Sequence, residues 1–378
     1  MLSSSASRLS KSYVCGKMAQ LNLTQNLAKQ WIEVSNSSSS QEDGNLRHAL
    51  MEFYLNNIAL NDLTLDSKKM REMAKGENWM ILREFLEEKG THTALGNICQ
   101  INCRKALKKL RKVLDHLSKL LHRYGELVHI GSEISLDIGE PIIISDSIQI
   151  ERGEIDAVFV LKNNLEQLTV FVIDWKRGLS NSNTLIQYKC QVQTYIRCLQ
   201  KKPDLINLDP STIDVSFKGY LIEIGGKEGT KSEIVEVNTD TESIDNFLSK
   251  AVAQYESNVA TPGPHCSSWC KWAFNEPCMS ITPESLSINF HSDSFWTDLR
   301  YQNKPIYNTL VQFNTELLTT LEQGGRNIIL FNNNRELHLK DINFSAEIER
   351  NRIVRIEGNV IRKTPNQAHL YVKHFSLI

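Results

Sequence analysis

The sequence contains no long hydrophobic run and no excess of charge of either sign. No stretch of about 18 or more apolar residues occurs, so we expect no membrane-spanning helix. The serine-rich N-terminal stretch also lacks the apolar segment of a secretory signal. Lysine plus arginine number 43 against 44 aspartate plus glutamate, which gives a formal net charge of −1. A polycationic protein is therefore excluded, and any contact with nucleic acid must be made by a local patch.

A phosphate-binding loop of the Walker type is also missing. The glycine-rich stretch at 225–231 has neither the spacing of such a loop nor the strand before it and the helix after it. We therefore expect no helicase motor in this chain, and any unwinding of a duplex would come from a partner protein.

Hydrophobic periodicity divides the chain into helical and strand-rich stretches. Apolar residues at helical spacing predict helices within 1–34 after a serine-rich start, over 44–60 and 62–124, and again over 182–201 and 242–259. Segments rich in β-branched residues predict strands over 126–138, 141–150, 154–161, 168–175, 214–224 and 232–239. The residues beyond 285 predict one helix around 306–323 among short strands, which indicates a small β-rich domain.

The long helical stretch ends in an amphipathic segment with one leucine stripe and many basic residues. The stripe consists of Leu107, Leu110, Leu114, Leu117 and Leu121, and the basic residues are Arg104, Lys105, Lys108, Lys109, Arg111 and Lys112. Two interpretations remain open: a solvated helix face, or a surface that follows the phosphates of a nucleic acid.

Three charged residues lie inside two apolar strands that a polar turn connects. A hairpin centred on Leu165 places Asp156 opposite Asp174, and Lys176 on the same face as Asp174. Two carboxylates so close repel each other unless a cation lies between them. Hard oxygen ligands suit Mg²⁺ or Mn²⁺, and a neighbouring ammonium can stabilise charge on a phosphate. An ordinary salt bridge at a sheet edge would also explain the Asp-x-Lys motif by itself.

The order of motifs along the chain resembles the PD-(D/E)xK nuclease superfamily, and within it the RecB-like branch. The matching residues are Gly44 and His48 (G-x-x-x-H), Gly153 and Asp156 (G-x-x-D), Asp174, Lys176 and Gly178 (D-x-K-x-G), and Gln191 and Tyr195 (Q-x-x-x-Y). The resemblance implies that His48, Asp156 and Asp174 bind Mg²⁺ or Mn²⁺ together with the main-chain carbonyl of Trp175. It implies that Lys176 acts on the attacking water and that Gln191 and Tyr195 position the substrate or Lys176. Glu133 stands where the family often has a strand glutamate ahead of G-x-x-D.

Three of the eight cysteines lie close together after the last predicted core helix. They are Cys266, Cys270 and Cys278, and two tryptophans lie between them. Such clustering indicates a metal site, since a chain of this length needs no disulfides, and it points to a reducing compartment. The other cysteines are candidates for a fourth ligand (Cys99, Cys103) or buried apolar residues (Cys190, Cys198).

The N-terminal stretch SSSASRLSKSYVCGKM is similar to the start of iron–sulfur nucleases of the RecB family. That resemblance implies a [4Fe–4S] cluster held by Cys15, Cys266, Cys270 and Cys278. The spacing C-x3-C-x7-C departs from the usual C-x2-C-x5-C, and Gly16 replaces a proline. Four thiolates would equally suit Zn²⁺.

The resemblance thus predicts an α/β fold with a restriction-endonuclease-like core, a mixed central sheet flanked by helices. We expect a nuclease domain over 1–284, with 62–124 as an insertion, and a β-rich accessory domain over 285–378. The implied function is a metal-dependent deoxyribonuclease, an exonuclease rather than an endonuclease, that acts on single strands or DNA ends in repair, recombination or defence. We expect it in the cytoplasm or nucleoid. The alternative is a non-catalytic DNA-binding or structural subunit with the same fold.

Overall fold

The computed structural model divides the chain into two compact units. The first comprises Met1–Ala19 and Ser39–Asn258, and the second holds the described residues from Val259 onward. The structure describes residues 2–17, 39–90, 99–179, 182–209, 215–225, 232–257, 259, 261, 286–287, 296–297, 306–314, 327–331, 335–340, 353–363 and 367–377. Over these ranges, no helix is both long and apolar enough to cross a membrane.

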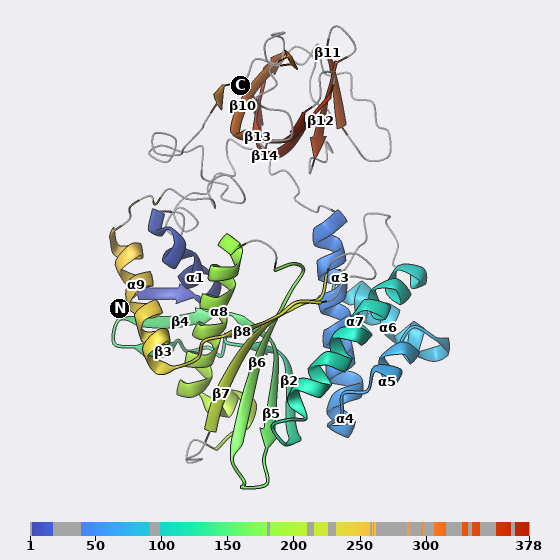
Figure 1. The fold of residues 1–378 in the computed structure, drawn as a ribbon, viewed down its shortest axis with the longest axis vertical. Helices are drawn as coiled ribbons and strands as arrows, with labels where there is room; N and C mark the ends of the chain where they lie inside the picture. Colours follow the sequence, from blue (N-terminus) through green and yellow to red (C-terminus); the bar gives the residue numbers. More distant parts are fainter. Residues whose placement is uncertain are drawn as a thin grey trace. The chain divides into compact units, whose positions relative to one another are not determined.

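A mixed five-stranded sheet forms the centre of the first unit (Figure 1). Its strand order is β2-β5-β6-β7-β8, with β6 and β7 parallel and the other neighbours antiparallel. The parallel pair is connected through helix α8 (Ser182–Lys201). The mixed central sheet flanked by helices that the sequence predicted is confirmed. The strands are β2 (Glu126–Ser135), β5 (Glu154–Lys162), β6 (Leu168–Lys176), β7 (Val215–Glu223) and β8 (Ile234–Val237).

The helices between residues 39 and 121 cover one face of this sheet. Leu107, Leu110 and Leu114 belong to the same buried cluster as Phe159 and Phe171 of the strands. The helical stretch 62–124 therefore packs as a layer on the sheet, and its status as an insertion remains a prediction. The elements of this layer are α3 (Ser39–Tyr54), η2 (Leu55–Ala59), α4 (Leu60–Asp62), α5 (Ser67–Glu72), α6 (Gly76–Glu88) and α7 (Gln100–Leu121).

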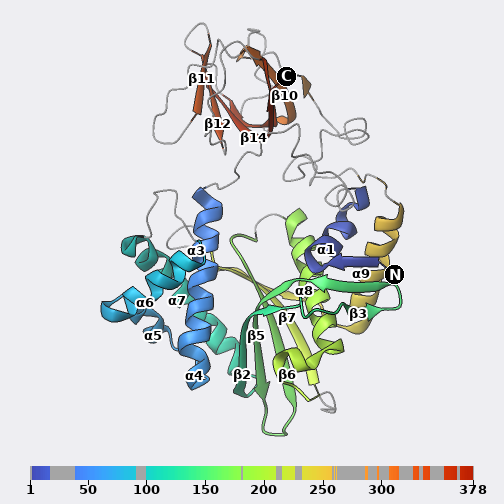
Figure 2. The same ribbon diagram turned by 180° about the vertical axis from the view of Figure 1, so that it is seen from behind.

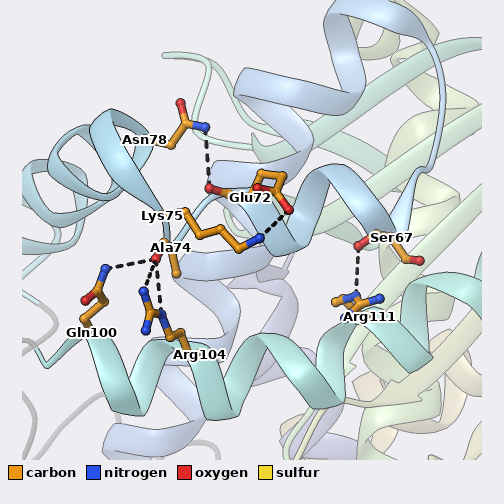
Figure 3. Close-up of polar contacts among 8 residues, drawn as sticks. All are labelled: Ser67, Glu72, Ala74, Lys75, Asn78, Gln100, Arg104 and Arg111. Atoms are coloured by element: carbon orange, nitrogen blue, oxygen red, sulfur yellow. Dashed lines mark hydrogen bonds and ion pairs between the residues drawn. The ribbon is translucent and has the colours of Figure 1, made fainter.

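Some of the basic residues of α7 make contacts within this layer (Figure 3). The guanidinium of Arg104 donates to the carbonyl of Ala74, and Nε of Arg111 donates to the carbonyl of Ser67 at 3.0 Å. The side chain of Lys109 is buried. These three residues support the packing of the helices, while Arg104, Lys105, Lys108 and Lys112 are exposed, so a surface that follows phosphates remains a prediction.

Helices α1 (Ala6–Val14), α8 and α9 (Thr241–Ser257) cover the other face. Val158, Val160, Val170 and Val172 point into this layer. The close approach of α8 depends on Gly219 of β7, because a Cβ atom there would lie 2.6 Å from Cγ1 of Val192.

A small second sheet lies beside the central one in the first unit. Its order is β1-β4-β3, and β1 runs parallel to β4 (Figure 2). The helix predicted after the serine-rich start is confirmed over α1, while the start itself forms β1, whose backbone bonds to the β3–β4 turn and β4, as in the 2.6 Å bond from Leu2 N–H to the Ser147 carbonyl. The single strand predicted over 141–150 is a hairpin. The strands are β1 (Leu2–Ser5), β3 (Ile142–Ser145) and β4 (Ile148–Arg152).

The second unit contains a six-stranded sheet in the order β11-β12-β14-β13-β10-β9. The helix predicted around 306–323 is wrong over 306–314, where β10 pairs antiparallel with β13. Pairing with distant strands overrides the local periodicity in this segment. The strands are β9 (Leu286–Ser287), β10 (Ile306–Asn314), β11 (Asn327–Phe331), β12 (Arg335–Lys340), β13 (Ile353–Lys363) and β14 (Gln367–Leu377).

Candidate active site

The β5–β6 hairpin has the predicted register. Val158 pairs with Val172 and Val160 with Val170. The turn is fixed by Asn163, whose Oδ1 accepts hydrogen bonds from the backbone N–H groups of Leu165 and Gln167. The described pairing ends at Ala157 and Ile173, so Asp156 and Asp174 occupy the next position on the two strands.

Asp174 and Lys176 form a buried ion pair at the end of β6. Nζ of Lys176 donates to Oδ1 of Asp174 at 2.8 Å and lies 2.7 Å from Oδ2. Asp174 is only 1% exposed, and its Oδ2 accepts no hydrogen bond. Burial raises the pKa of Asp174 to about 7, although the Lys176 charge opposes this shift. Burial lowers the pKa of Lys176, but the carboxylates of Asp174 and Asp156 outweigh it, so the net shift is upward and the ammonium stays charged.

Asp156 faces this pair from the neighbouring strand. Its Oδ2 accepts a hydrogen bond of 2.6 Å from the backbone N–H of Trp175 and lies 3.8 Å from Nδ1 of His48. Burial raises the pKa of Asp156, and the Lys176 charge opposes that shift. The predicted use of the Trp175 carbonyl as a ligand remains a prediction, since the contact with Asp156 is made by its N–H.

Three side chains from different elements converge beside the hairpin. One ligand atom from each of His48 (α3), Glu133 (β2) and Asp156 (β5) lies within 4.8 Å of the others. Burial, and next the Lys176 charge, lower the pKa of His48 to about 4, so its imidazole is neutral and can donate a lone pair. Burial and the charge of Asp156 raise the pKa of Glu133 to about 8.

Glu133 reaches this cluster through an irregular backbone. It stands between Ser132, which pairs with Ala157, and Ile134, which pairs with Ile155, so it lies opposite Asp156. Its φ angle is 50°, in the left-handed region that residues with a side chain rarely adopt. Such strain is often found at functional sites.

Helix α8 contributes three polar side chains to the same region. Nε2 of Gln191 donates to the hydroxyl of Tyr195 at 2.6 Å. Burial and the charges of Asp174 and Asp156 raise the pKa of Tyr195 well above its ordinary value. Nζ of Lys176 also lies 4.6 Å from the ring centroid of Tyr188, a cation–π contact. Tyr188 was not predicted from the sequence. Its position one helical turn before Gln191 is the signal that could have indicated it.

A cavity of about 510 Å³ opens onto these groups. One side is lined by the acidic pair and its partners: Asp156, Asp174, Lys176, Gln191 and Tyr195. The other side is formed by the start of the chain and the end of β4. The structure therefore brings the predicted catalytic residues to one solvent-accessible hollow.

Comparison with known families supports the same conclusion. The sequence matches the family described as the PD-(D/E)XK nuclease superfamily over residues 3–274. This chain belongs to that superfamily. Membership implies a metal-dependent nuclease that acts on DNA. The RecB-like assignment remains a prediction.

Other comparisons add little to this superfamily assignment. A solved structure described as "Crystal structure of SSO0001" has 16% sequence identity, and the alignment covers 56% of this chain and 81% of that one. Its TM-score is 0.25, so this likeness carries no argument. No curated protein matches the chain.

The donor set of this superfamily member fits a hard divalent cation. One neutral imidazole and two carboxyl groups converge beside the buried Asp174, whose carboxylate is paired with Lys176. Carboxylate oxygens with one imidazole suit Mg²⁺ or Mn²⁺. Asp174 is not one of the three converging residues, so its predicted role as a ligand stays a prediction.

Only one of the four predicted cluster cysteines is described. Cys15 is buried at the C-terminal end of α1, whereas Cys266, Cys270 and Cys278 lie outside the described residues. A Cβ atom on Gly16 would lie 1.7 Å from the carbonyl oxygen of Gln254 in α9. Glycine is therefore required at this position, where the iron–sulfur nucleases that the N-terminal stretch resembles have a proline.

Proposed function

We propose that this protein is a metal-dependent deoxyribonuclease that hydrolyses phosphodiester bonds in single-stranded DNA or at DNA ends. The observation that carries the proposal is the buried Asp174–Lys176 pair, which faces Asp156 in a cavity beside three convergent metal donors. A salt bridge with a purely structural role would not need these donors or an open cavity beside it.

The residues of the site divide into metal donors and groups that act on the phosphate. His48, Glu133 and Asp156 would hold the ion, with the adjacent carboxylate of Asp174 as a further donor. When bound, Mg²⁺ or Mn²⁺ polarises the phosphoryl oxygen and lowers the pKa of a bound water. These roles are the ones expected from the chemistry of the side chains.

Lys176 stabilises negative charge and orients water, and it does not act as a general base. Its pKa is raised by two carboxylates, so it carries no free electron pair near neutral pH. The Tyr188 ring and the carboxylate of Asp174 hold its ammonium in place. Gln191 and Tyr195, bonded to each other, position the substrate beside it.

The size of the cavity favours a single strand. A volume of about 510 Å³ is within the range of small-molecule pockets and suits one nucleotide better than both strands of a duplex. We propose exonucleolytic action on free ends, since a single strand can enter such a site from its end. A duplex would need to be opened by an unwinding partner.

The test compares end-labelled single-stranded, duplex and circular DNA with Mn²⁺ or Mg²⁺. We expect products from linear single strands, fewer from blunt duplexes and few from circles, with the label indicating polarity. Equal cleavage of circles would contradict exonuclease action. If no substrate is cleaved at all, the chain is better explained as a DNA-binding subunit that retains the nuclease fold.

We also infer a four-thiolate metal site that involves Cys15, with a [4Fe–4S] cluster as the first candidate and Zn²⁺ as the second. The support is that Cys15 is buried, and that Gly16 packs against the last turns of α9, after which the chain leads to Cys266. Anaerobically purified protein should be brown and contain about four irons per chain. Colourless protein with zinc would contradict the cluster. Either site implies a reducing compartment such as the cytoplasm or nucleoid.

A further inference from the structure

The wall of the cavity that faces the acidic residues is built from the start of the chain and the end of β4. Ser5, Ser7 and Arg152 line the same cavity as Asp174 and Lys176. None of these three residues belongs to the motifs of the nuclease superfamily described above. Their position in the same cavity as Asp156, Asp174 and Lys176 suggests contact with the substrate.

The fold brings this wall into place through long-range pairing. Strand β1 lies parallel to β4, with Ser5 paired with Arg152, and α1 begins at the next residue (Figures 1 and 2). A Cβ atom on Gly153 would lie 3.3 Å from Cβ of Ala6 and 3.0 Å from Cδ1 of Leu136. The glycine of the G-x-x-D motif therefore leaves room for the first turn of α1.

Arg152 is the cation of this wall that has no partner among the described residues. It is exposed, and within the described ranges its guanidinium makes no ion pair or hydrogen bond. Arg8 lies close enough that burial, followed by the charge of Arg152, lowers the Arg8 pKa. Lys176, the other cation that lines the cavity, is bound to Asp174.

The hydroxyl of Ser7 lies on the same wall. The neighbouring Ser5 is already engaged, because its Oγ accepts a hydrogen bond from the backbone N–H of Arg8. The Ser7 hydroxyl makes no hydrogen bond to the residues that the structure describes, so it can donate to a ligand. The acidic residues on this side, Asp137 and Glu154, would repel an anion, which leaves Arg152 as the attractive group.

We propose that Arg152, assisted by the hydroxyl of Ser7, binds the backbone phosphate next to the scissile phosphate. This proposal rests on the proposed function, since it concerns how the same cavity holds a DNA strand. An arginine fork matches the oxygens of a phosphodiester. A contact to the backbone positions the strand without reading its bases, so binding at this point is independent of sequence.

The test replaces single phosphates of an oligonucleotide by neutral methylphosphonates, one position at a time. For the wild type we expect one position next to the cleaved bond at which the replacement lowers kcat/KM about tenfold, the effect of losing a charged hydrogen bond. In Arg152→Ala, kcat/KM for the unmodified strand should fall by about the same factor. The methylphosphonate at that position should then cause no further loss in this variant. Arg152→Lys should recover part of the loss.

The matched control is Arg123→Ala, an exposed arginine at the far end of the central sheet, which should keep the wild-type pattern. If Arg152→Ala and the wild type respond equally to every replacement, the proposal is wrong. Binding of the same methylphosphonate oligonucleotides is measured by fluorescence anisotropy in the presence of Ca²⁺, which allows binding without cleavage. Absence of cleavage together with a position-specific, Arg152-dependent loss of binding would overturn the proposed function and leave this phosphate contact standing.

Discussion

The carboxylate of Asp156 in β5 accepts a 2.6 Å hydrogen bond from the backbone N–H of Trp175 in β6. The indole of Trp175 is buried in the core on one face of the sheet, while its neighbours Asp174 and Lys176 line the cavity on the other. The packing of one side chain therefore fixes the orientation of the acidic groups. This coupling of core and site is the basis of the predictions that follow.

The Asp174–Lys176 pair should contribute unequally to stability. Asp174→Asn leaves a buried ammonium without its partner, so we expect a loss of about 3 kcal/mol in the free energy of unfolding. Lys176→Met should cost less, because Asp174, with a pKa of about 7, can take up a proton when its partner is removed. Denaturant unfolding at neutral pH measures both variants and the double variant. A double variant that loses the sum of the two single losses would show that the residues do not interact.

Glu133 should bind the metal ion directly. Glu133→Gln removes one of the three converging metal-donor groups, so we expect the dissociation constant for Mn²⁺ to rise about tenfold or more. Isothermal titration calorimetry gives the value. Glu126→Gln, on the same strand at its other end, is the matched control and should bind Mn²⁺ like the wild type. Equal affinity in both variants would remove Glu133 from the site.

The stability of the metal-free protein should decrease as the pH rises. The pKa of Glu133 is raised from 4.5 to about 8 on folding, so the folded state holds a proton that the unfolded chain has released between these values. The stabilisation that this Glu133 proton provides is complete below the pKa of Glu133 in the unfolded chain. It is lost as the pH rises through the pKa of Glu133 in the folded protein. In EDTA, the melting temperature of the wild type should fall more between about pH 5.5 and 8.5 than that of Glu133→Gln. Parallel curves would contradict the raised pKa.

Gly219 should control the position of α8. Gly219→Ala places a Cβ atom 2.6 Å from Cγ1 of Val192, and we expect overpacking of about 1–3 kcal/mol together with lower activity, because Gln191 is the neighbouring residue. Gly178→Ala is the matched control, since the nearest atom to a Cβ there is a flexible Glu223 oxygen at 3.8 Å. Thermal unfolding separates the two variants. A stable Gly219→Ala protein with full activity would disprove this packing constraint.

The parts of the fold that depend on local pattern were predicted correctly from the sequence. The β5–β6 hairpin followed from two apolar runs around a polar turn, and its register then placed Asp156 beside Asp174. Helix α7 followed from its leucine stripe, which is buried in the structure. In both cases the burial of one face specifies the structure, so the pattern of apolar residues is sufficient.

The parts of the fold that depend on distant contacts were not predicted from the sequence. The strand β1 forms because its backbone pairs with β4, which no local pattern of the serine-rich start indicates. The approach of Glu133 to Asp156 depends on a positive φ angle at a non-glycine residue. Segment β10 has mixed periodicity, and only its pairing with β13 decides that it is a strand.

The most direct test of the central claim is Mn²⁺-dependent cleavage of labelled single-stranded DNA by wild type and two matched aspartate variants. Asp156→Asn removes a residue of the metal-donor group, and Asp137→Asn changes an aspartate of the same cavity outside that group. The account predicts cleavage by the wild type that EDTA abolishes, a loss of at least about 100-fold in Asp156→Asn, and nearly full activity in Asp137→Asn. Cleavage that continues in EDTA, or an Asp156→Asn protein as active as the wild type, would contradict it.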